Sequence, residues 1–358
     1  MKSKNSINLK NKTYIIAEVG VNHNGSIALA KKIILGAKKS GADCVKFQIF
    51  DSGKLVTKNA PKAEYQIKNT KNKENQFKML KSLELKKKDY LNLKSYCKKL
   101  KIDFLLSVFD EDSLIFAQRK INLKQIKIPS GELNNYFLLD KIDKKTFIIM
   151  SSGMSTINEI AKSINRIFKK EIYKIKNKIS INQNLLKTIK EKIIVLHCVT
   201  DYPVDMKYAN IDAISYLRNI LQINIGYSDH TAGIIAPALA VAKGAKMIEK
   251  HITLSKKMKG PDHKASLDLD EFKKMVKLIR DTELMLGNGI KKIEKCEVKN
   301  MEIAKKSIVA KINIKKGEYF SFKNITAKRP FNGISPDNID NYLKKKSKMN
   351  LKKDEKVI

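Results

Sequence analysis

The sequence has few cysteines, and they are too far apart for a disulfide or zinc framework. None of the four forms a C-x-x-C pair, so reduced thiols in a cytoplasmic protein are the simplest expectation. Residues 1–12 are polar and lack the apolar segment of a signal peptide. The longest apolar run, Ile234–Ala242, contains Pro237 and falls short of the roughly 18 residues that a membrane span needs. We therefore expect no membrane partner and a cytoplasmic location.

Arginine is also scarce, although the chain is strongly basic. Of the 73 basic residues five are arginine and 68 are lysine, and the formal net charge is +37. Proteins that read base sequence favour arginine, because its guanidinium group forms two hydrogen bonds with guanine. The lysines are spread over the whole chain, which favours solvated surface lysines over a nucleic-acid partner. A positive field would still help to attract an anionic substrate.

Short apolar runs alternate with amphipathic, helix-like stretches over the first 285 residues. Eight such repeats predict an α/β fold, a (β/α)8 TIM barrel. A doubly wound open sheet is the alternative, but no G-x-G-x-x-G motif follows the first run. The predicted strands are Tyr14–Glu18, Cys44–Gln48, Asp103–Ser107, Gln125–Ile128, Phe147–Ser151, Ile193–His197, Asn224–Tyr227 and Met247–His251.

The composition changes after the last predicted helix. We expect residues 1–286 to form the barrel, 287–300 a polar linker and 301–358 a small β-rich domain, because Ser307–Ile312 alternates in polarity. Two intervals within the barrel are longer than a simple unit requires. Asp51–Lys88 follows a strand end and is expected to cover part of the active face. Lys170–Lys192 is interpreted as a lysine-rich, helix-prone surface insertion.

Polar side chains collect where the predicted strands end, which is where a barrel carries its active site. Lys46 and Lys127 stand at two of these ends and predict a site for a phosphate and a carboxylate. The alternative for each lysine is a side chain that extends from the barrel rim into solvent. The hydroxyl groups that would complete an anion site belong to Ser107, Ser130, Thr200 and Ser228.

Histidines end two adjacent predicted strands. Neighbouring strands lie about 4.8 Å apart, so His230 and His251 could share a divalent cation and leave positions open for substrate. Two hydrogen-bonded core histidines are the alternative. Glu132 follows the fourth strand and is placed to act as a general base, the alternative being a salt bridge to Lys127.

The other three histidines give weaker signals. His23 could join the site or orient a loop, and His197 could be a core residue. His263 follows Asp262 in a predicted loop and is expected to be exposed.

Several segments, in order and at suitable spacing, resemble the sialic acid synthase family. In the barrel region they are Ala17–Gly25, Val45–Gln48, Ala60–Gln66, Lys127–Glu132, Ser152–Met154, Gly226–Thr231, Ile248–His251 and Gly260–His263. Near the C-terminus, Lys306–Ala310 and Lys328–Pro330 resemble the antifreeze-like (SAF) domain of that family. Any one motif is only moderately specific, whereas the set is highly specific.

The resemblance implies a function. Family members condense phosphoenolpyruvate with an N-acetylated amino sugar, and C–O cleavage releases phosphate. It implies a divalent cation, Mn²⁺ first and Mg²⁺ or Co²⁺ as alternatives, on His230 and His251. It also implies a domain-swapped homodimer in which the SAF domain of one subunit caps the barrel of the other.

The resemblance also assigns roles to residues. Glu132, Glu18 and Lys127 are the expected catalytic groups, with Glu132 as the base. The groups expected to hold phosphoenolpyruvate are Lys46, Ser107, Lys127, Ser130, Thr200 and Ser228. Those expected to hold the sugar are Glu18, Gln48, Tyr202, Asp262 and Arg329 of the partner subunit.

The expected activity is N-acetylneuraminate synthesis from N-acetylmannosamine. The alternative is N,N'-diacetyllegionaminate synthesis from 2,4-diacetamido-2,4,6-trideoxymannose. More distant alternatives are an eight-carbon ketosugar synthase, a lysine-rich nucleic-acid binder and a relative without catalysis. The last is suggested by Val108, where the family has proline, and by Phe331, where it has a small residue.

Overall fold

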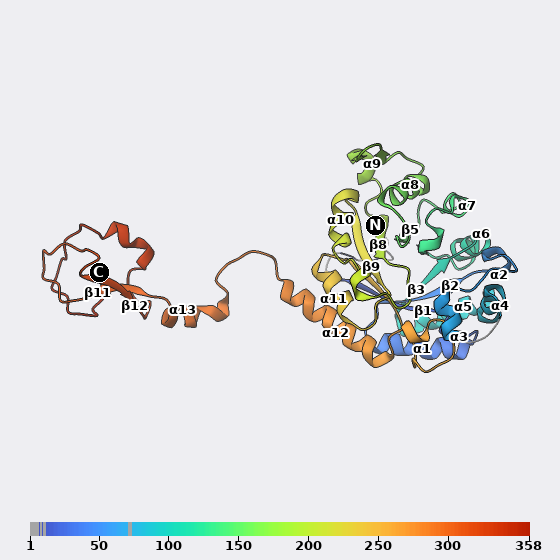
Figure 1. The fold of residues 1–358 in the computed structure, drawn as a ribbon, viewed down its shortest axis with the longest axis horizontal. Coiled ribbons are helices and arrows are strands. Elements are labelled where there is room, and N and C mark those ends of the chain that lie inside the picture. The colour runs from blue at the N-terminus through green and yellow to red at the C-terminus, as the bar shows by residue number, and fades with distance from the viewer. Residues whose placement is uncertain (1–6, 8, 10–11, 71–73) are drawn as a thin grey trace. The chain divides into compact units, whose positions relative to one another are not determined.

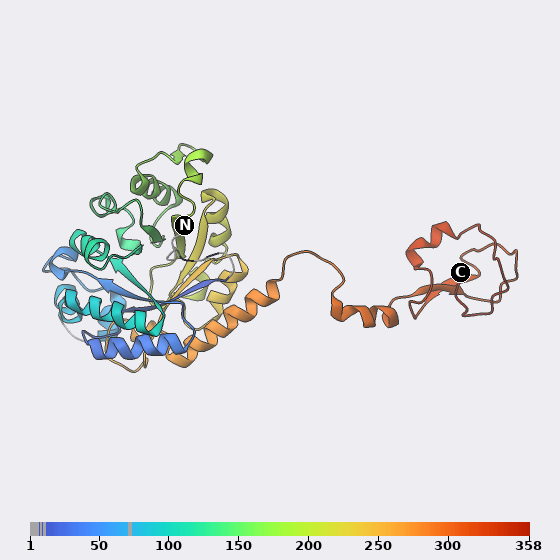
Figure 2. The ribbon, with the colours of Figure 1, turned by 180° about the vertical axis from the view of Figure 1, so that it is seen from behind.

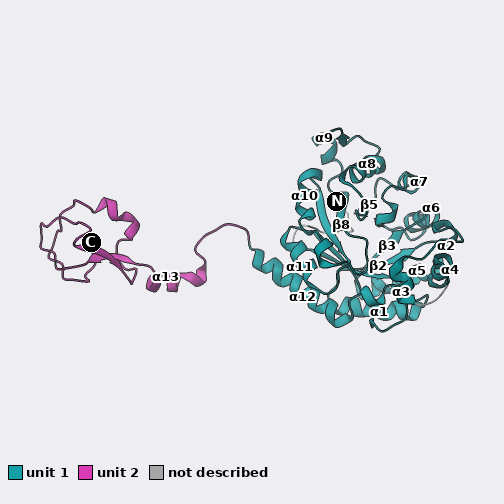
Figure 3. Ribbon diagram, viewed as in Figure 1, with its two compact units in different colours: residues 1–287 teal, residues 288–358 magenta. Residues whose placement is uncertain are grey.

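The computed structural model describes residues 7, 9, 12–70 and 74–358. The chain forms two compact units, Met1–Gly287 and Asn288–Ile358 (Figure 3). Each unit is described by itself below. No helix within the described ranges is long and apolar enough to cross a membrane.

The first unit is a closed barrel of parallel strands in the order β1-β10-β9-β8-β5-β4-β3-β2 (Figure 1). This confirms the predicted TIM barrel and excludes the open sheet. Each predicted strand is present, with ends shifted by two residues at most. The barrel strands are β1 (Tyr14–Gly20), β2 (Cys44–Ile49), β3 (Asp103–Val108), β4 (Gln125–Ile128), β5 (Phe147–Ser151), β8 (Ile193–Cys198), β9 (Asn224–Asp229) and β10 (Met247–His251).

The strands are buried on both faces, and most of their residues are therefore apolar. Ile16, Leu105, Ile149 and Ile194 belong to a small cluster of strand residues that is separate from the main core. The main core includes residues such as Ile15, which precedes Ile16 on β1. Successive strand residues point to opposite faces, so these two clusters occupy the two sides of the barrel wall.

Helices surround the barrel (Figure 1). Figure 2 shows α1 and α12 lying along the same flank, in contact with each other. Side-chain caps set several helix starts: Ser26 caps α1, and Thr156 forms a capping box with Glu159 at the start of α8. The main helices are α1 (Ile27–Lys39), α5 (Lys87–Leu100), α6 (Glu111–Ile115), α7 (Tyr136–Leu139), α8 (Ile157–Phe168), α10 (Ala213–Leu221), α11 (Ile235–Ala242) and α12 (Leu269–Leu286).

The two long intervals have different structures. Asp51–Lys88 carries the short helices α2 (Ser52–Leu55), α3 (Glu64–Thr70) and α4 (Gln76–Leu83). The helix-prone interpretation of Lys170–Lys192 is wrong for its first half, which is a hairpin of β6 (Tyr173–Ile175) and β7 (Ile179–Ile181) before the short helix α9 (Gln183–Lys187). The hairpin is anchored from outside the segment, because the Asn165 amide binds the backbone of Ile172 and Tyr173.

The second unit contains α13 (Val298–Ala304) and an antiparallel pair, β11 (Ser307–Ala310) and β12 (Ile325–Lys328). Its own small core includes Ile308, Phe320, Ile325 and Leu351. Isolated bridges such as Ile314 with Leu351 extend the β structure, as the alternating sequence predicts.

Candidate active site

A cavity of about 640 Å³ lies at the C-terminal ends of the barrel strands. Every predicted site residue of the first unit lines it. They are Glu18, Lys46, Gln48, Ser107, Lys127, Ser130, Glu132, Thr200, Tyr202, Ser228, His230, His251 and Asp262. Strand register explains the convergence, because Glu18 pairs with Lys46 across β1 and β2, and Ser107 pairs with Lys127 across β3 and β4.

Two lysines and two carboxylates form the charged part of the cavity. The Lys46 ammonium lies 3.2 Å from Glu18 and 3.1 Å from Glu249. The Lys127 ammonium lies 3.1 Å from the same Glu249 oxygen. All four side chains are at most 5% exposed, so neither lysine extends into solvent. Lys46 also donates a hydrogen bond to Ser107 Oγ at 2.8 Å.

Glu249 was not among the predicted site residues, yet it joins the two lysines. It also accepts a hydrogen bond from Ser228 Oγ at 2.9 Å. Burial opposes its ionisation, but Lys127 and Lys46 outweigh burial and hold the pKa of Glu249 far below its usual range. For Glu18 burial dominates over Lys46, so the pKa of Glu18 is raised. Glu249 stands two residues before His251 on β10, so both side chains point to the same face of the strand. This spacing was the sequence signal that places Glu249 in the cavity.

Two hydroxyl groups of the cavity are available to a ligand. Thr200 Oγ1 and Ser151 Oγ are buried and make no hydrogen bond within the described structure. Gly153 is required beside them, because a Cβ there would lie 2.1 Å from Thr200 Oγ1 and 2.8 Å from Ser130 Oγ. Buried polar atoms are normally satisfied, so unpaired ones lining a cavity indicate that a polar ligand completes them.

His230 and His251 face each other at a ring-centroid distance of 5.7 Å. Nδ1 of His230 lies 2.8 Å from the Val199 carbonyl, which can only accept, so Nδ1 carries a proton and Nε2 is the nitrogen left for a cation. Burial lowers the pKa of His230, but Cys198 and the Val199 carbonyl outweigh burial and raise it. Nδ1 of His251 is buried without a hydrogen-bond partner. Burial, together with His230 and Lys46, holds the pKa of His251 well below its usual range, so its ring is neutral.

These properties fit a divalent cation held by two imidazoles, because the neutral ring of His251 can bind metal directly and a cation that binds His230 displaces any proton from Nε2. No group of three or more His, Cys, Asp or Glu residues suited to a metal ion occurs among the residues with described positions. The protein would therefore supply two histidine ligands, leaving the remaining positions to oxygen atoms of substrate or water. The ring of Tyr202 packs against His230 at 4.2 Å and limits the space beside it.

Glu132 lies in the short turn of helix Ser130–Glu132 that follows β4. The alternative of a salt bridge to Lys127 is wrong, because Lys127 pairs with Glu249. Glu132 instead accepts a hydrogen bond of 2.6 Å from the Asn135 amide. Burial raises the pKa of Glu132, and the Asn135 contact offsets part of that effect. A raised pKa suits a general base that must exchange protons near neutral pH.

Two of the residues predicted to hold the sugar, Gln48 and Asp262, interact with Glu18 of the charged cluster. Gln48 donates to Glu18 Oε1 at 3.2 Å. Asp262 is buried, and burial together with Glu18 raises its pKa to about 7 against the opposing effect of His230. Arg329 belongs to the second unit, where it is exposed and donates from Nε to Ala304 O at 2.8 Å.

One side of the cavity is apolar. Leu55 from α2, Met79, Leu80 and Leu83 from α4, and Phe109 after β3 line it. These side chains pack together as a separate cluster. The sequence predicted that the interval Asp51–Lys88 covers the active face, and three short helices of this interval lie at the cavity. We call these five residues the apolar wall.

The remaining histidines do not line the cavity. His197 is a core residue that contacts Ala209 O at 2.9 Å and stacks on Tyr227. His23 is buried and accepts a hydrogen bond from Gly25 N, so it orients a loop. The expectation of an exposed His263 is wrong: it is fully buried and its Nδ1 lies 2.7 Å from Thr253 Oγ1. Val108 is buried in the core, while Ser107 faces the cavity.

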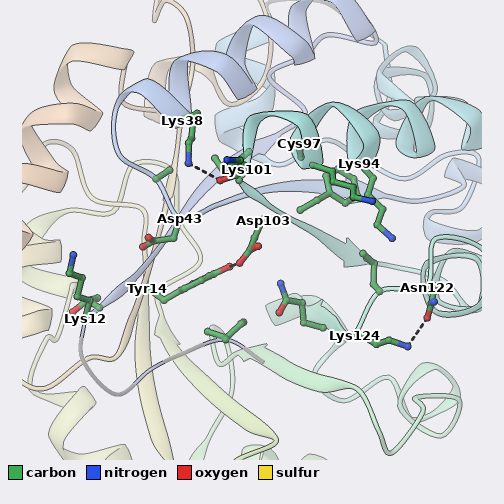
Figure 4. Close-up of a pocket in the computed structure, with 18 residues that line it drawn as sticks. Lys12, Tyr14, Lys38, Asp43, Lys94, Cys97, Lys101, Asp103, Asn122 and Lys124 are labelled. Carbon is green, nitrogen blue, oxygen red and sulfur yellow. Dashed lines mark hydrogen bonds between the residues drawn. The ribbon is translucent and has the colours of Figure 1, made fainter. Parts of the chain in front are cut away.

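A second cavity, of about 870 Å³, lies at the other end of the barrel (Figure 4). Tyr14 and Asp103, at the starts of β1 and β3, meet there through a 2.6 Å hydrogen bond. Several lysines line it, but Lys38, Lys94 and Lys124 donate to oxygen atoms of the protein itself. It is larger than the first cavity but lies at the face of a TIM barrel that does not carry the active site.

The fold is a TIM barrel whose strands bring a buried cluster of lysines and carboxylates, a histidine pair and the buried Glu132 to one cavity. The chain belongs to the NeuB family, whose sequence profile matches residues 33–291, and a SAF domain profile matches residues 305–357. It is thus an enzyme of the sialic acid synthase type.

Three relatives illustrate the similarity. The N,N'-diacetyllegionaminic acid synthase of Campylobacter jejuni is 44% identical over 97% of this chain and 99% of its own length. The enzyme of that name from Legionella pneumophila is 39% identical over 94% of this chain and 91% of its own. The crystal structure of N-acetylneuraminic acid synthetase from Leptospira borgpetersenii superposes with a TM-score of 0.66 at 30% identity, covering 82% of this chain and 91% of that one.

Proposed function

We propose that this protein condenses phosphoenolpyruvate with 2,4-diacetamido-2,4,6-trideoxymannose and water to give N,N'-diacetyllegionaminate and phosphate. The observation that carries this choice is the 44% identity, over nearly the whole of both chains, to a relative named for that reaction. The sequence led us to expect N-acetylneuraminate first, and that product stays the competing candidate because the Leptospira borgpetersenii relative is named for it.

The apolar wall supports the legionaminate choice. Compared with N-acetylmannosamine, the trideoxy sugar carries a methyl group at C6 in place of a hydroxymethyl group, and a second acetamido group. Both changes add apolar surface, whose burial contributes about 25 cal/mol per Å². Leu80 and Phe109 offer such burial, whereas the C6 hydroxyl of N-acetylmannosamine would have to give up its hydration against them.

The charged cluster would bind phosphoenolpyruvate. Its phosphate and carboxylate would contact Lys46 and Lys127, and Thr200 and Ser151 would donate their unpaired hydroxyls. Ser107, Ser130 and Ser228 complete this side of the cavity. Glu249 would keep both ammonium groups in place before the substrate arrives. Glu18, Gln48, Tyr202 and Asp262 would hold the open-chain sugar.

The reaction forms one carbon–carbon bond and breaks one carbon–oxygen bond. C3 of phosphoenolpyruvate attacks the sugar aldehyde carbon, whose oxygen takes up a proton. Water then adds to the cationic C2 and gives one proton to Glu132. The C2–O bond to phosphate breaks as the new hydroxyl becomes the C2 carbonyl, and the hydroxyl proton leaves with the phosphate. His230 and His251 would hold a divalent cation, Mn²⁺ first, which when bound supplies polarisation of the aldehyde carbonyl. Lys127 stabilises the leaving phosphate.

We further propose a cytoplasmic, domain-swapped homodimer with a barrel at 1–286, a linker at 287–300 and a SAF domain at 301–358. Exposed apolar side chains support a partner surface near the junction, since Leu284 and Met285 end α12 in the first unit and Ile303 lies on α13 in the second. In the dimer, Arg329 of the partner subunit would reach the sugar. All four cysteines are free thiols, and three of them are buried, which supports a reducing compartment.

Phosphate release from phosphoenolpyruvate tests the function. The assay contains Mn²⁺ and compares 2,4-diacetamido-2,4,6-trideoxymannose with N-acetylmannosamine. We expect the trideoxy sugar to give the higher kcat/KM. A higher value with N-acetylmannosamine would return the function to N-acetylneuraminate synthesis, and no release with either sugar from a folded protein would refute both.

A further inference from the structure

An ion pair lies directly behind the histidine pair. The Lys250 ammonium lies 2.5 Å from Asp229 Oδ2, and both side chains are 0% exposed. Asp229 is the residue before His230, and Lys250 is the residue before His251. The two are register partners on β9 and β10, so their contact joins these neighbouring strands at the point where the histidines leave them.

The ion pair is on the opposite side of the barrel wall from the cavity. Ser228 and His230 on one chain segment, and Glu249 and His251 on the other, line the cavity. Successive residues of a strand alternate between faces, so Asp229 and Lys250 point away from it. Any influence of this pair on the site must therefore pass through the backbone of β9 and β10.

Further hydrogen bonds extend the ion pair into a clamp around His230. The Lys250 ammonium also donates to Thr231 O at 2.5 Å. Asp229 Oδ1 accepts hydrogen bonds from Thr231 N at 2.9 Å and from the Tyr227 hydroxyl at 3.1 Å. The residues on both sides of His230 are thus tied to the residue that precedes His251. We call Tyr227, Asp229, Thr231 and Lys250 the strand clamp.

We propose that Asp229 and Lys250 are positioning residues that fix the separation of His230 and His251. The inference rests on the cation site of the proposed function. With only two protein ligands, the cation affinity depends strongly on the distance between two rings, each held on a different strand. A buried ion pair contributes little net stability but favours one geometry, because any displaced arrangement leaves a buried charge unpaired.

The cost to cation binding can be separated from the cost to stability. Removing groups that orient metal ligands typically weakens metal binding by about 10- to 100-fold. A purely structural clamp would lower the unfolding temperature and leave the dissociation constant of the folded protein unchanged. The readout is therefore Mn²⁺ affinity of the folded dimer, measured by calorimetry and by the Mn²⁺ electron paramagnetic resonance signal, without either substrate.

Tyr227→Phe is the mild variant, since it removes one hydrogen bond to Asp229 and keeps the ion pair. Tyr173→Phe is its matched control, because that buried hydroxyl donates to Leu221 O at 2.7 Å, away from the cavity. We expect Tyr227→Phe to weaken Mn²⁺ binding roughly two- to tenfold, as loss of one hydrogen bond predicts. Tyr173→Phe should lose stability alone.

The paired variant tests the proposal more severely. The single variant Lys250→Met leaves the Asp229 carboxylate buried and unpaired. The double variant, Lys250→Met with Asp229→Asn, removes that charge and should be more stable than the single variant. We expect that double variant to bind Mn²⁺ about 10- to 100-fold more weakly than the wild type. Wild-type affinity in both the double variant and Tyr227→Phe would overturn the positioning role while leaving the proposed function intact. If the wild-type protein binds no Mn²⁺, both the cation site and this inference fail.

Discussion

Lys46 and Lys127 contact the same atom, Oε1 of Glu249, each across 3.1 Å. The two ammonium groups share one carboxylate oxygen, and of the two only Lys46 also forms an ion pair with the second carboxylate, Glu18, within the described structure. An anion that enters the cavity therefore meets two cations that are already fixed in place. Preorganised charges of this kind need no rearrangement when the substrate binds.

Replacing Glu249 with glutamine should make protein stability depend on phosphate. Without the carboxylate the two buried ammonium groups are incompletely paired, which costs about 3–5 kcal/mol of unfolding free energy when a buried pair is broken. Phosphate can replace the missing negative charge, so it should raise the unfolding temperature of Glu249→Gln more than that of the wild type. Thermal unfolding with and without phosphate measures this, with the exposed Glu191→Gln as control. If phosphate raises the unfolding temperature of Glu249→Gln and of the wild type equally, Glu249 is not the anion that pairs both lysines.

Replacing Lys127 with methionine should lower kcat/KM for phosphoenolpyruvate and also cost stability, because Lys127 is one partner of a buried charge contact. The methionine keeps the apolar part of the side chain but removes the ammonium group. Loss of one partner of a buried charge contact costs about 2–5 kcal/mol, which corresponds to roughly 30-fold or more. Steady-state kinetics with each substrate varied separately locates the effect. Lys190→Met removes the same charge from the surface and should change neither parameter.

The acid side of the pH–rate profile should report Glu132. This carboxylate must be ionised to accept a proton, and burial raises its pKa. The rate should therefore fall as the pH decreases through that raised pKa, starting at a higher pH than the ordinary value of about 4.3 would give. Glu132→Gln should lower kcat by about 10²- to 10⁴-fold and remove this acid limb. An unchanged acid limb in the variant would assign the titration to another group.

Much of the fold and site could be predicted because the barrel ties them to simple patterns. Each strand is a short apolar run, and parallel strands deliver their C-terminal residues to one face, so Lys46, Lys127 and His230 could be brought together without coordinates. Glu249 lies in a predicted strand but was given no role, because a carboxylate between Ile248 and Lys250 gives no local sign that two lysines lie opposite. Contacts across the barrel decide its role, and they depend on register.

Two other features were predicted wrongly. The β6–β7 hairpin alternates apolar and polar residues from Tyr173 to Ile181, a strand pattern that the helix-prone interpretation did not use, and the Asn165 side chain of the preceding helix anchors it. His263 was expected in solvent because it lies in a loop, but Thr253 and Asn24 supply partners that allow it to be buried. For His263, tertiary hydrogen bonds override the exposure that its place in a loop suggests.

The apolar wall gives the last prediction, which concerns sugar choice. Leu80 is half-buried and lines the cavity from α4, so a serine there should be tolerated by the fold. Serine replaces apolar surface with a hydroxyl, which weakens contact with a methyl group and can hydrogen-bond a hydroxymethyl group. We therefore expect Leu80→Ser to lower kcat/KM for the trideoxy sugar and to reduce its advantage over N-acetylmannosamine by about tenfold, the scale on which apolar pockets discriminate single groups.

The control for this substitution is Leu100→Ser, a half-buried leucine at the end of α5 that packs on the main core away from the cavity. It should cost stability to a similar degree and leave the ratio of the two sugars unchanged. Competition between the two sugars in one reaction, with product masses measured, gives that ratio directly and is insensitive to the amount of active enzyme. If Leu80→Ser lowers the rate with both sugars by the same factor, α4 supports the cavity without selecting the substituent, and the preference must come from the polar groups around Glu18 and Asp262.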